Sequence, residues 1–126
     1  MENTLTKNNV ITLDLENGTF EENFLGDNFG IGIMLDGKEI GFIIGFACQE
    51  CVLIELISLE EGFRRKGYGT LAMQELIRIS KKLNCHHIEA DCRTELISFY
   101  KRLGADFTHR DPDDATYINH RFYIDL

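Results

Sequence analysis

The chain has 126 residues and a mass of 14.5 kDa, which predicts a single domain over residues 1–126. Its 13 lysines and arginines against 21 aspartates and glutamates give a net charge of −8, which argues against a nucleic-acid partner. No stretch reaches the roughly 18 apolar residues of a membrane span, and the polar start, Met1 to Asn9, lacks the apolar segment of a signal peptide. We expect a cytoplasmic protein with no membrane partner, whose acidic surface weakly favours cations such as amines.

Apolar runs and turn signals in the first half of the chain predict four strands. The expected strands are Val10 to Leu15, Gly30 to Leu35, Ile40 to Ala47 and Val52 to Leu59. Asp36-Gly37 predicts a type I′ hairpin, because both central residues of that turn take positive φ. The acidic residues 17–28 predict a loop or a short irregular helix. In the third strand the residues expected to share one face are Ile40, Phe42, Ile44 and Phe46. The fourth run is almost continuously apolar, which predicts a central strand buried on both faces.

The second half of the chain changes to a helical period. Thr70 to Asn84 predicts an amphipathic helix with a buried face of Ala72, Leu76, Ile79 and Leu83. A strand is expected at His87 to Cys92, followed by a second helix with Thr94 as N-cap and Gly104 as stop. Tyr117 to Leu126 alternates and predicts a closing strand, with Ile118, His120, Phe122, Ile124 and Leu126 on one face. This order predicts a mixed α+β sheet with helices packed on it.

A basic, glycine-containing loop, Phe63 to Thr70 (FRRKGYGT), lies between the apolar strand and the first long helix. A helix N-terminus presents free N–H groups and partial positive charge, and glycines let an anion approach the backbone. Arg64, Arg65 and Lys66 add positive charge. The loop therefore predicts a pyrophosphate site, with a plain glycine turn as the alternative. It matches neither a Walker A loop nor the dinucleotide fingerprint.

The pattern Arg64-x-x-Gly67-x-Gly69 resembles the acyl-CoA loop of the GNAT superfamily of N-acetyltransferases. Ile57-Ser58-Leu59 resembles the strand segment before that loop, and Thr94 to Gly104 (TELISFYKRLG) resembles the family's later tyrosine-bearing helix. The resemblance covers roughly Gly30 to Leu126. It implies a GNAT-like mixed, mostly antiparallel, twisted sheet flanked by helices, with a shortened N-terminal helical arm.

The same resemblance implies an acetyl-CoA site. In this family pantetheine lies between two strands that separate after a bulge, so the backbone of Ile57, Ser58 and Leu59 is expected to bind it. The N–H near Ile57 is expected to polarise the thioester carbonyl. The N–H groups of the loop are expected to hold the pyrophosphate, with added charge from basic side chains. The expected cofactor-binding residues of this loop are Arg64, Arg65, Lys66, Gly67, Tyr68, Gly69 and Thr70.

Two residues are the catalytic candidates. Tyr100 stands at the family's tyrosine and is expected to protonate the departing CoA thiolate, with core packing beside Leu96 and Leu103 as the alternative. Glu55 lies inside the apolar strand, and alternation places it on the face of Ile57 and Leu59. It is the candidate general base, acting directly or through a water, with an ion pair to a neighbouring strand as the equal alternative. The weaker candidates are Glu60, Glu61 and His120.

The chain departs from the family pattern in two places. Arg93-Thr94 stands where many relatives have an asparagine, so Arg93 is expected to reach a phosphate instead. Only Glu16 to Phe29 is available where relatives have two helices that help to build the acceptor site. The acceptor pocket is therefore expected to be open, or completed by a second subunit in a homodimer.

The four cysteines allow one further hypothesis. Cys48-x-x-Cys51 together with Cys85, His86, His87 and Cys92 could form a zinc site, but the second half lacks a C-x-x-C spacing. Cys48 and Cys51 are expected to flank a hairpin turn. Reduced structural thiols are the favoured interpretation, and no metal site is expected.

These observations predict an acetyltransferase that moves an acetyl group from acetyl-CoA directly to a primary amine. The acceptor would be a small cationic metabolite, a drug or a protein amine. The alternatives are a non-catalytic acyl-CoA-binding or regulatory module of the same fold, and a small zinc-binding interaction domain.

Overall fold

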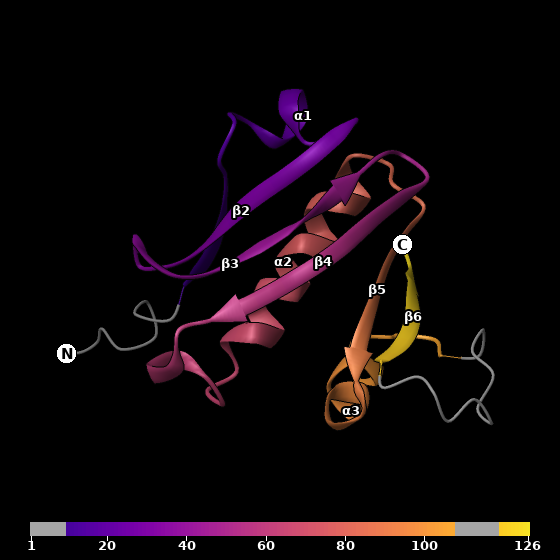
Figure 1. Ribbon diagram of the computed structural model, residues 1–126. Coiled ribbons are helices and arrows are strands. Elements are labelled where there is room, and N and C mark those ends of the chain that lie inside the picture. Colours follow the sequence, from indigo (N-terminus) through magenta and orange to yellow (C-terminus); the bar gives the residue numbers. More distant parts are fainter. Residues whose placement is uncertain (1–9, 108–118) are drawn as a thin grey trace.

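The computed structural model describes residues 10–107 and 119–126. The elements in chain order are β1 (Ile11–Leu15), α1 (Phe20–Asn23), β2 (Asp27–Leu35), β3 (Lys38–Ala47), β4 (Cys51–Leu59), the 3₁₀ helix η2 (Glu61–Phe63), α2 (Tyr68–Lys82), β5 (His87–Arg93), the 3₁₀ helix η3 (Thr94–Leu96), α3 (Ile97–Lys101) and β6 (Asn119–Asp125). The described strands form one sheet in the order β1-β2-β3-β4-β5-β6 (Figure 1). Neighbouring strands are antiparallel except for the parallel pair β4–β5. The predicted mixed, mostly antiparallel α+β sheet is confirmed.

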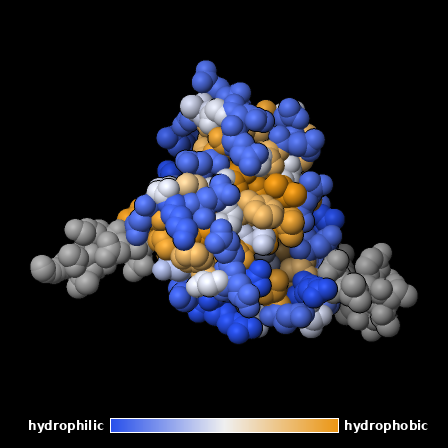
Figure 2. Space-filling model, turned by 60° about the vertical axis from the view of Figure 1, so that its left-hand side comes forward, coloured by the Kyte–Doolittle hydropathy of each residue, from blue (hydrophilic) through white to orange (hydrophobic). Residues whose placement is uncertain are grey.

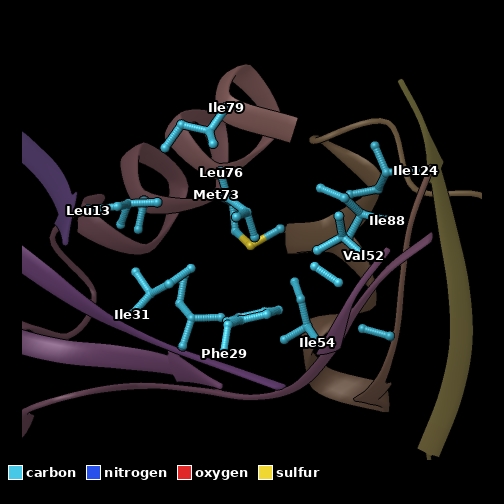
Figure 3. Packing of buried hydrophobic residues seen from close by; sticks show 14 of the residues in the cluster. Leu13, Phe29, Ile31, Val52, Ile54, Met73, Leu76, Ile79, Ile88 and Ile124 are labelled. Atoms are coloured by element: carbon cyan, nitrogen blue, oxygen red, sulfur yellow. The ribbon is translucent and has the colours of Figure 1, made fainter. Parts of the chain in front are cut away.

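The core lies between the sheet and α2, which crosses one face of the sheet (Figure 1). Of the predicted buried face of α2, Ala72, Leu76 and Ile79 are buried, and Met73 is buried beside them. Leu83, which the helical period also placed on this face, follows the end of α2 and is only half-buried. The buried side chains of α2 meet inward-pointing residues of the strands (Figure 3), among them Leu13, Phe29, Ile31, Val52, Ile54, Ile88 and Ile124. Each such side chain contributes about 1.5–3 kcal/mol when it is fully buried. The face of the sheet that α2 covers is called the inner face below, and the opposite face is called the outer face.

Local signals set the turns of the fold. Asp36 and Gly37 have φ values of 51° and 88°, which confirms the predicted type of hairpin between β2 and β3. Gly104 has a φ of 93° and follows α3, as expected of a helix stop. The prediction that Thr94 is the N-cap of the second helix is wrong. The 3₁₀ helix η3 precedes α3, and the Thr94 hydroxyl lies 2.8 Å from Nε2 of His120. Of the predicted closing strand, Tyr117 and Ile118 lie outside the described residues.

The predicted faces of β3 and β4 need correction. Phe42, Ile44 and Phe46 are each 38% exposed on the outer face, and Leu56 of β4 is 48% exposed. The residues of β3 that point inward are Ile43, Gly45 and Ala47. Ile40 is fully buried and does not share the face of Phe42, because the pairing with β2 shifts register at Ile40.

The outer face is exposed because the described helices pack on the inner one. α1 has four residues, and Phe24 at its end contacts the inner-face residue Phe29. Tyr100 of α3 stacks on Phe122, an inner-face residue of β6. Apolar side chains therefore remain in contact with solvent, and Figure 2 shows them gathered between polar ones on the molecular surface. The prediction that β4 is buried on both faces is wrong.

Candidate functional site

Strands β4 and β5 pair over four residues and then separate (Figure 1). Their parallel pairs run from Cys51–His87 to Ile54–Ala90. Beyond that point β4 continues to Leu59 paired only with β3, and β5 continues to Arg93 paired only with β6. We call the gap between residues 55–59 and 91–93 the fork. Backbone groups that border the fork have no strand partner across it among the described residues, so an extended ligand can pair with them.

A bulge in β4 stands at the start of the fork. Ile44 of β3 faces Leu56, whereas the next residue, Gly45, faces Ile54, so Glu55 is an extra residue in β4. A bulge bends its strand and increases the local twist. The bend accounts for the course of β4 away from β5. The strand separation after a bulge, which the resemblance implies, is therefore present.

The basic loop leads into the N-terminus of α2 beside the fork. Gly67 is the N-cap with a φ of 88°, and this cap makes no side-chain hydrogen bond to the helix. The first N–H groups of a helix have no intrahelical acceptor, so a helix N-terminus is suited to binding an anion. A Cβ placed on Gly67 would meet no atom within 4 Å, so there is open space at this position. Arg65 and Lys66 are exposed in the same loop. The loop thus fits an anionic group such as pyrophosphate.

Contacts of Arg64 and Gly69 hold the loop against the fork. Nε of Arg64 donates to the backbone oxygen of Leu59 at 2.8 Å, which ties the loop to the end of β4. A Cβ on Gly69 would lie 3.6 Å from Cζ of Phe99 and 3.9 Å from Cδ1 of Leu59. The start of α2, the end of β4 and α3 therefore meet at one place. The sequence did not reveal the backbone contact of Arg64.

Tyr100 is buried beside the fork, at 5% exposure. Its ring stacks on Phe122 at 4.4 Å between centroids and meets Phe99 edge-on at 4.8 Å. Burial, together with the nearby Cys92, raises the pKa of Tyr100 to about 12. The hydroxyl therefore keeps its proton near neutral pH. Packing in the core and a proton available at Oη are both features of this side chain.

Glu55 lies at the fork but not as expected. Its side chain is exposed, so it is not a carboxylate inside an apolar interior. The bulge also breaks the simple alternation that placed Glu55 on the face of Ile57 and Leu59. Within residues 10–107 and 119–126 its carboxylate forms no ion pair. The alternative expectation, that Glu55 forms an ion pair with a neighbouring strand, therefore finds no support among these residues.

The remaining expected residues are distributed around the same place. Ile57, Ser58 and Leu59 are half-buried on β4 beyond the bulge. Arg93 is exposed at the end of β5, across the fork. The weaker candidates lie at the periphery: Glu60 and Glu61 are exposed beyond β4, and His120 is next to Thr94.

A group of polar residues on the outer face of β5 and β6 was missed. Arg121 donates from Nη1 to Glu89 at 2.7 Å and pairs through Nε with Asp91 at 2.9 Å. The signal was present in the alternation of β5, where His87, Glu89 and Asp91 share one face. The partner Arg121 could not be assigned without the register between β5 and β6. The register of β4 also brings Cys51 beside His87.

Comparisons with known proteins agree with this geometry. Residues 6–105 match the family model described as acetyltransferase (GNAT) family. An acetyltransferase from Bacillus subtilis in complex with CoA has a TM-score of 0.67 at 19% identity, over 93% of this chain and 99% of that one. A GNAT family acetyltransferase from Elizabethkingia anophelis with acetyl-CoA bound has a TM-score of 0.68 at 14% identity, over 92% and 98%. An acetyltransferase from Bacillus cereus has a TM-score of 0.65 at 23% identity, over 79% and 74%. The structural similarity establishes the fold, and the family match over most of the chain shows that it belongs to the acetyltransferase (GNAT) family.

Proposed function

We propose that this protein is an acetyltransferase that binds acetyl-CoA in the fork and transfers the acetyl group directly to a primary amine. The observation that carries the proposal is the separation of β4 from β5 beside the basic N-terminus of α2. Acetyl-CoA supplies the acetyl group in activated form, as a thioester. Two of the similar structures named above contain CoA or acetyl-CoA, which supports this choice of cofactor.

The chain would hold the cofactor mainly through backbone groups. Ile57, Ser58 and Leu59 would pair with the amides of pantetheine, as an added strand does. The N–H groups from Arg65 to Thr70 would bind the pyrophosphate, with charge from the Arg65 and Lys66 side chains. Arg64 would position the loop through Leu59, in addition to the charge that the sequence suggests. The loop residues involved would be Arg64, Arg65, Lys66, Gly67, Tyr68, Gly69 and Thr70.

Two side chains would move protons. Tyr100 would donate its Oη proton to the departing sulfur, and its raised pKa means that the proton is present at neutral pH. Glu55 would accept the proton of the attacking amine, directly or through a water. Its position at the bulge and its freedom from ion pairs with described residues support this role, whereas Asp91 across the fork is paired with Arg121. Arg93 would contact a phosphate group.

The acceptor would be a cationic amine, on a small metabolite, a drug or a protein. The net charge of −8 supports attraction of such a molecule. No helix among the described residues has the length and apolarity to cross a membrane. The cytoplasmic location and the homodimer stay predictions, and a monomeric mass in solution scattering would contradict the dimer.

The test measures acetyl-CoA turnover with a panel of primary amines, and release of the free CoA thiol reports each turnover. Tyr100→Phe and Glu55→Gln should each lower turnover by about 10²- to 10⁴-fold, the usual contribution of a general acid or base. Glu39→Gln is the control, because Glu39 is also exposed but lies at the start of β3, outside the proposed catalytic and binding residues. Acetyl-CoA affinity should stay within about threefold of the parent in all three variants, since binding rests on the loop and the strand backbone.

The same assay separates the proposal from the non-catalytic alternative. A purely acyl-CoA-binding module would bind acetyl-CoA and release no thiol with any amine of the panel. Turnover that is equal in the parent, Tyr100→Phe and Glu55→Gln would remove both residues from the mechanism.

A further inference from the structure

Three potential metal ligands from two neighbouring strands meet on the outer face of the sheet. Cys51 begins β4 and His87 begins β5, and these two residues form the first pair of the parallel ladder. Glu89 follows two positions along β5 on the same face. One ligand atom from each side chain lies within 4.8 Å of the other two. We call these residues the Cys51–His87–Glu89 cluster.

We propose that the Cys51–His87–Glu89 cluster binds a divalent transition-metal ion of the Zn²⁺ type, with a fourth position open to water. This site lies at the closed end of the fork, where β4 and β5 share only four residue pairs. A bound ion would join the two strands there. The proposal does not depend on the acetyltransferase function, because none of its three ligands belongs to the proposed cofactor or catalytic residues.

Two of the three distances within the cluster suit tetrahedral coordination, and the third lies within 4.8 Å. Sγ of Cys51 lies 3.7 Å from Oε1 of Glu89, and Nε2 of His87 lies 3.4 Å from the same oxygen. With Zn–N and Zn–O bonds near 2.0 Å and Zn–S near 2.3 Å, neighbouring ligands of a tetrahedral ion are separated by about 3.3–3.7 Å. Small side-chain shifts therefore bring all three atoms around one ion.

The ligand types also select the class of metal. One thiolate, one imidazole and one carboxylate suit zinc and related ions, whereas calcium and magnesium prefer oxygen ligands alone. The Cys51 thiol now donates toward Oε1 of Glu89. Coordination would replace this contact, and the thiol proton would pass to the solvent.

Neighbouring residues hold two of the ligands in place. Nη1 of Arg121 donates to Oε2 of Glu89 at 2.7 Å, which leaves Oε1 directed at the other two ligands. The ring of Tyr123 meets the ring of His87 edge-on at 5.5 Å between centroids. Such supporting contacts orient metal ligands and tune their affinity. The His87 and Glu89 side chains are 28% and 24% exposed, so an ion can enter from the outer face.

The neighbouring Cys48 and His86 make other contacts. The Cys48 thiol is directed at the backbone oxygen of Cys51, at 3.6 Å. Nδ1 of His86 lies 3.2 Å from the Glu50 carboxylate, and the His86 side chain is 58% exposed. His86 therefore provides a control of the same residue type, one position away from a proposed ligand.

The experiment titrates the metal-free full-length chain with Co²⁺, which reports thiolate coordination through a charge-transfer absorption band. The parent should bind one equivalent with this band, and Zn²⁺ should displace Co²⁺. Cys51→Ser should remove the band, and His87→Gln should weaken Co²⁺ binding by about 10-fold or more, while His86→Gln should match the parent within about twofold. Circular dichroism confirms that each variant is folded.

Two results would overturn the proposal. One is a folded parent that shows no charge-transfer band at excess Co²⁺. The other is a band that persists in Cys51→Ser or weakens equally in His86→Gln and His87→Gln. If Cys51→Ser does not fold, Arg121→Gln takes its place, with an expected affinity loss of about 10-fold or more. Unchanged affinity in that variant would then count against the site.

Discussion

Replacing Gly45 by alanine tests the close approach of β3 and β4 at the bulge. A Cβ at this position would collide with the backbone oxygen of Leu53 and would lie 2.9 Å from Cζ of Phe29. The backbone oxygen cannot move without separating the strands. Overpacking of this kind costs about 1–3 kcal/mol, and each disturbed backbone hydrogen bond adds about 1 kcal/mol. The lower entropy cost of alanine returns about 0.5–1 kcal/mol. Gly45→Ala should therefore destabilise the fold by about 2–3 kcal/mol.

Urea unfolding followed by circular dichroism measures this loss. For a slope of about 1–3 kcal/mol/M the midpoint should fall by about 0.7–3 M. Gly62→Ala is the control, because a Cβ there meets no atom within 4 Å and no positive φ is involved. Its midpoint should stay at the parent value or rise slightly. Equal midpoints for Gly45→Ala and Gly62→Ala would refute the strand spacing on which the position of Glu55 depends.

Two further predictions concern the core and the buried tyrosine. Leu76→Ala should lower the free energy of unfolding by about 2–5 kcal/mol, because Leu76 is fully buried under the sheet. The control is Leu71→Ala, at a position that is 39% exposed, which should cost under about 1 kcal/mol in the same urea assay. The pKa of Tyr100 is raised from 10.0 to about 12 in the folded chain. The protonated hydroxyl therefore contributes fully to the free energy of unfolding below pH 10, and this contribution is lost as the pH rises through 12. The parent should therefore lose about 2–3 kcal/mol more than Tyr100→Phe across this window, and parallel stability curves for the two proteins would contradict the burial of the hydroxyl.

Much of the fold could be predicted because its signals are local. The hairpin at Asp36-Gly37 follows from two residues that tolerate positive φ, and α2 follows from its apolar period. The loop from Arg64 to Gly69 could be placed because it joins a strand to a helix. The tyrosine-bearing helix was found, although it begins with a 3₁₀ turn instead of a cap at Thr94.

The remaining features depend on strand register, which hydrophobic alternation does not specify. The extra residue at Glu55 leaves no mark in the apolar run, so its face and its exposure were both assigned incorrectly. Alternation also did not specify which face of β3 is exposed to solvent, because the tertiary arrangement determines which face of the sheet the helices cover. Cys51 and His87 are 36 positions apart, and only the parallel pairing of β4 with β5 brings them together.

We propose above that the N-terminus of α2 binds the pyrophosphate of acetyl-CoA, and calorimetric titration of two Gly67 variants tests this binding. Asparagine and aspartate both tolerate the positive φ of 88° at this position and have nearly the same shape, so the variants differ mainly in charge. A carboxylate about 4 Å from a phosphate costs about 1–4 kcal/mol at the effective dielectric constants of a protein surface. Gly67→Asp should bind acetyl-CoA at least about fivefold more weakly than Gly67→Asn, with less difference at high salt. Equal affinities of the two folded variants, or no binding by the folded parent, would contradict pyrophosphate binding at the N-terminus of α2.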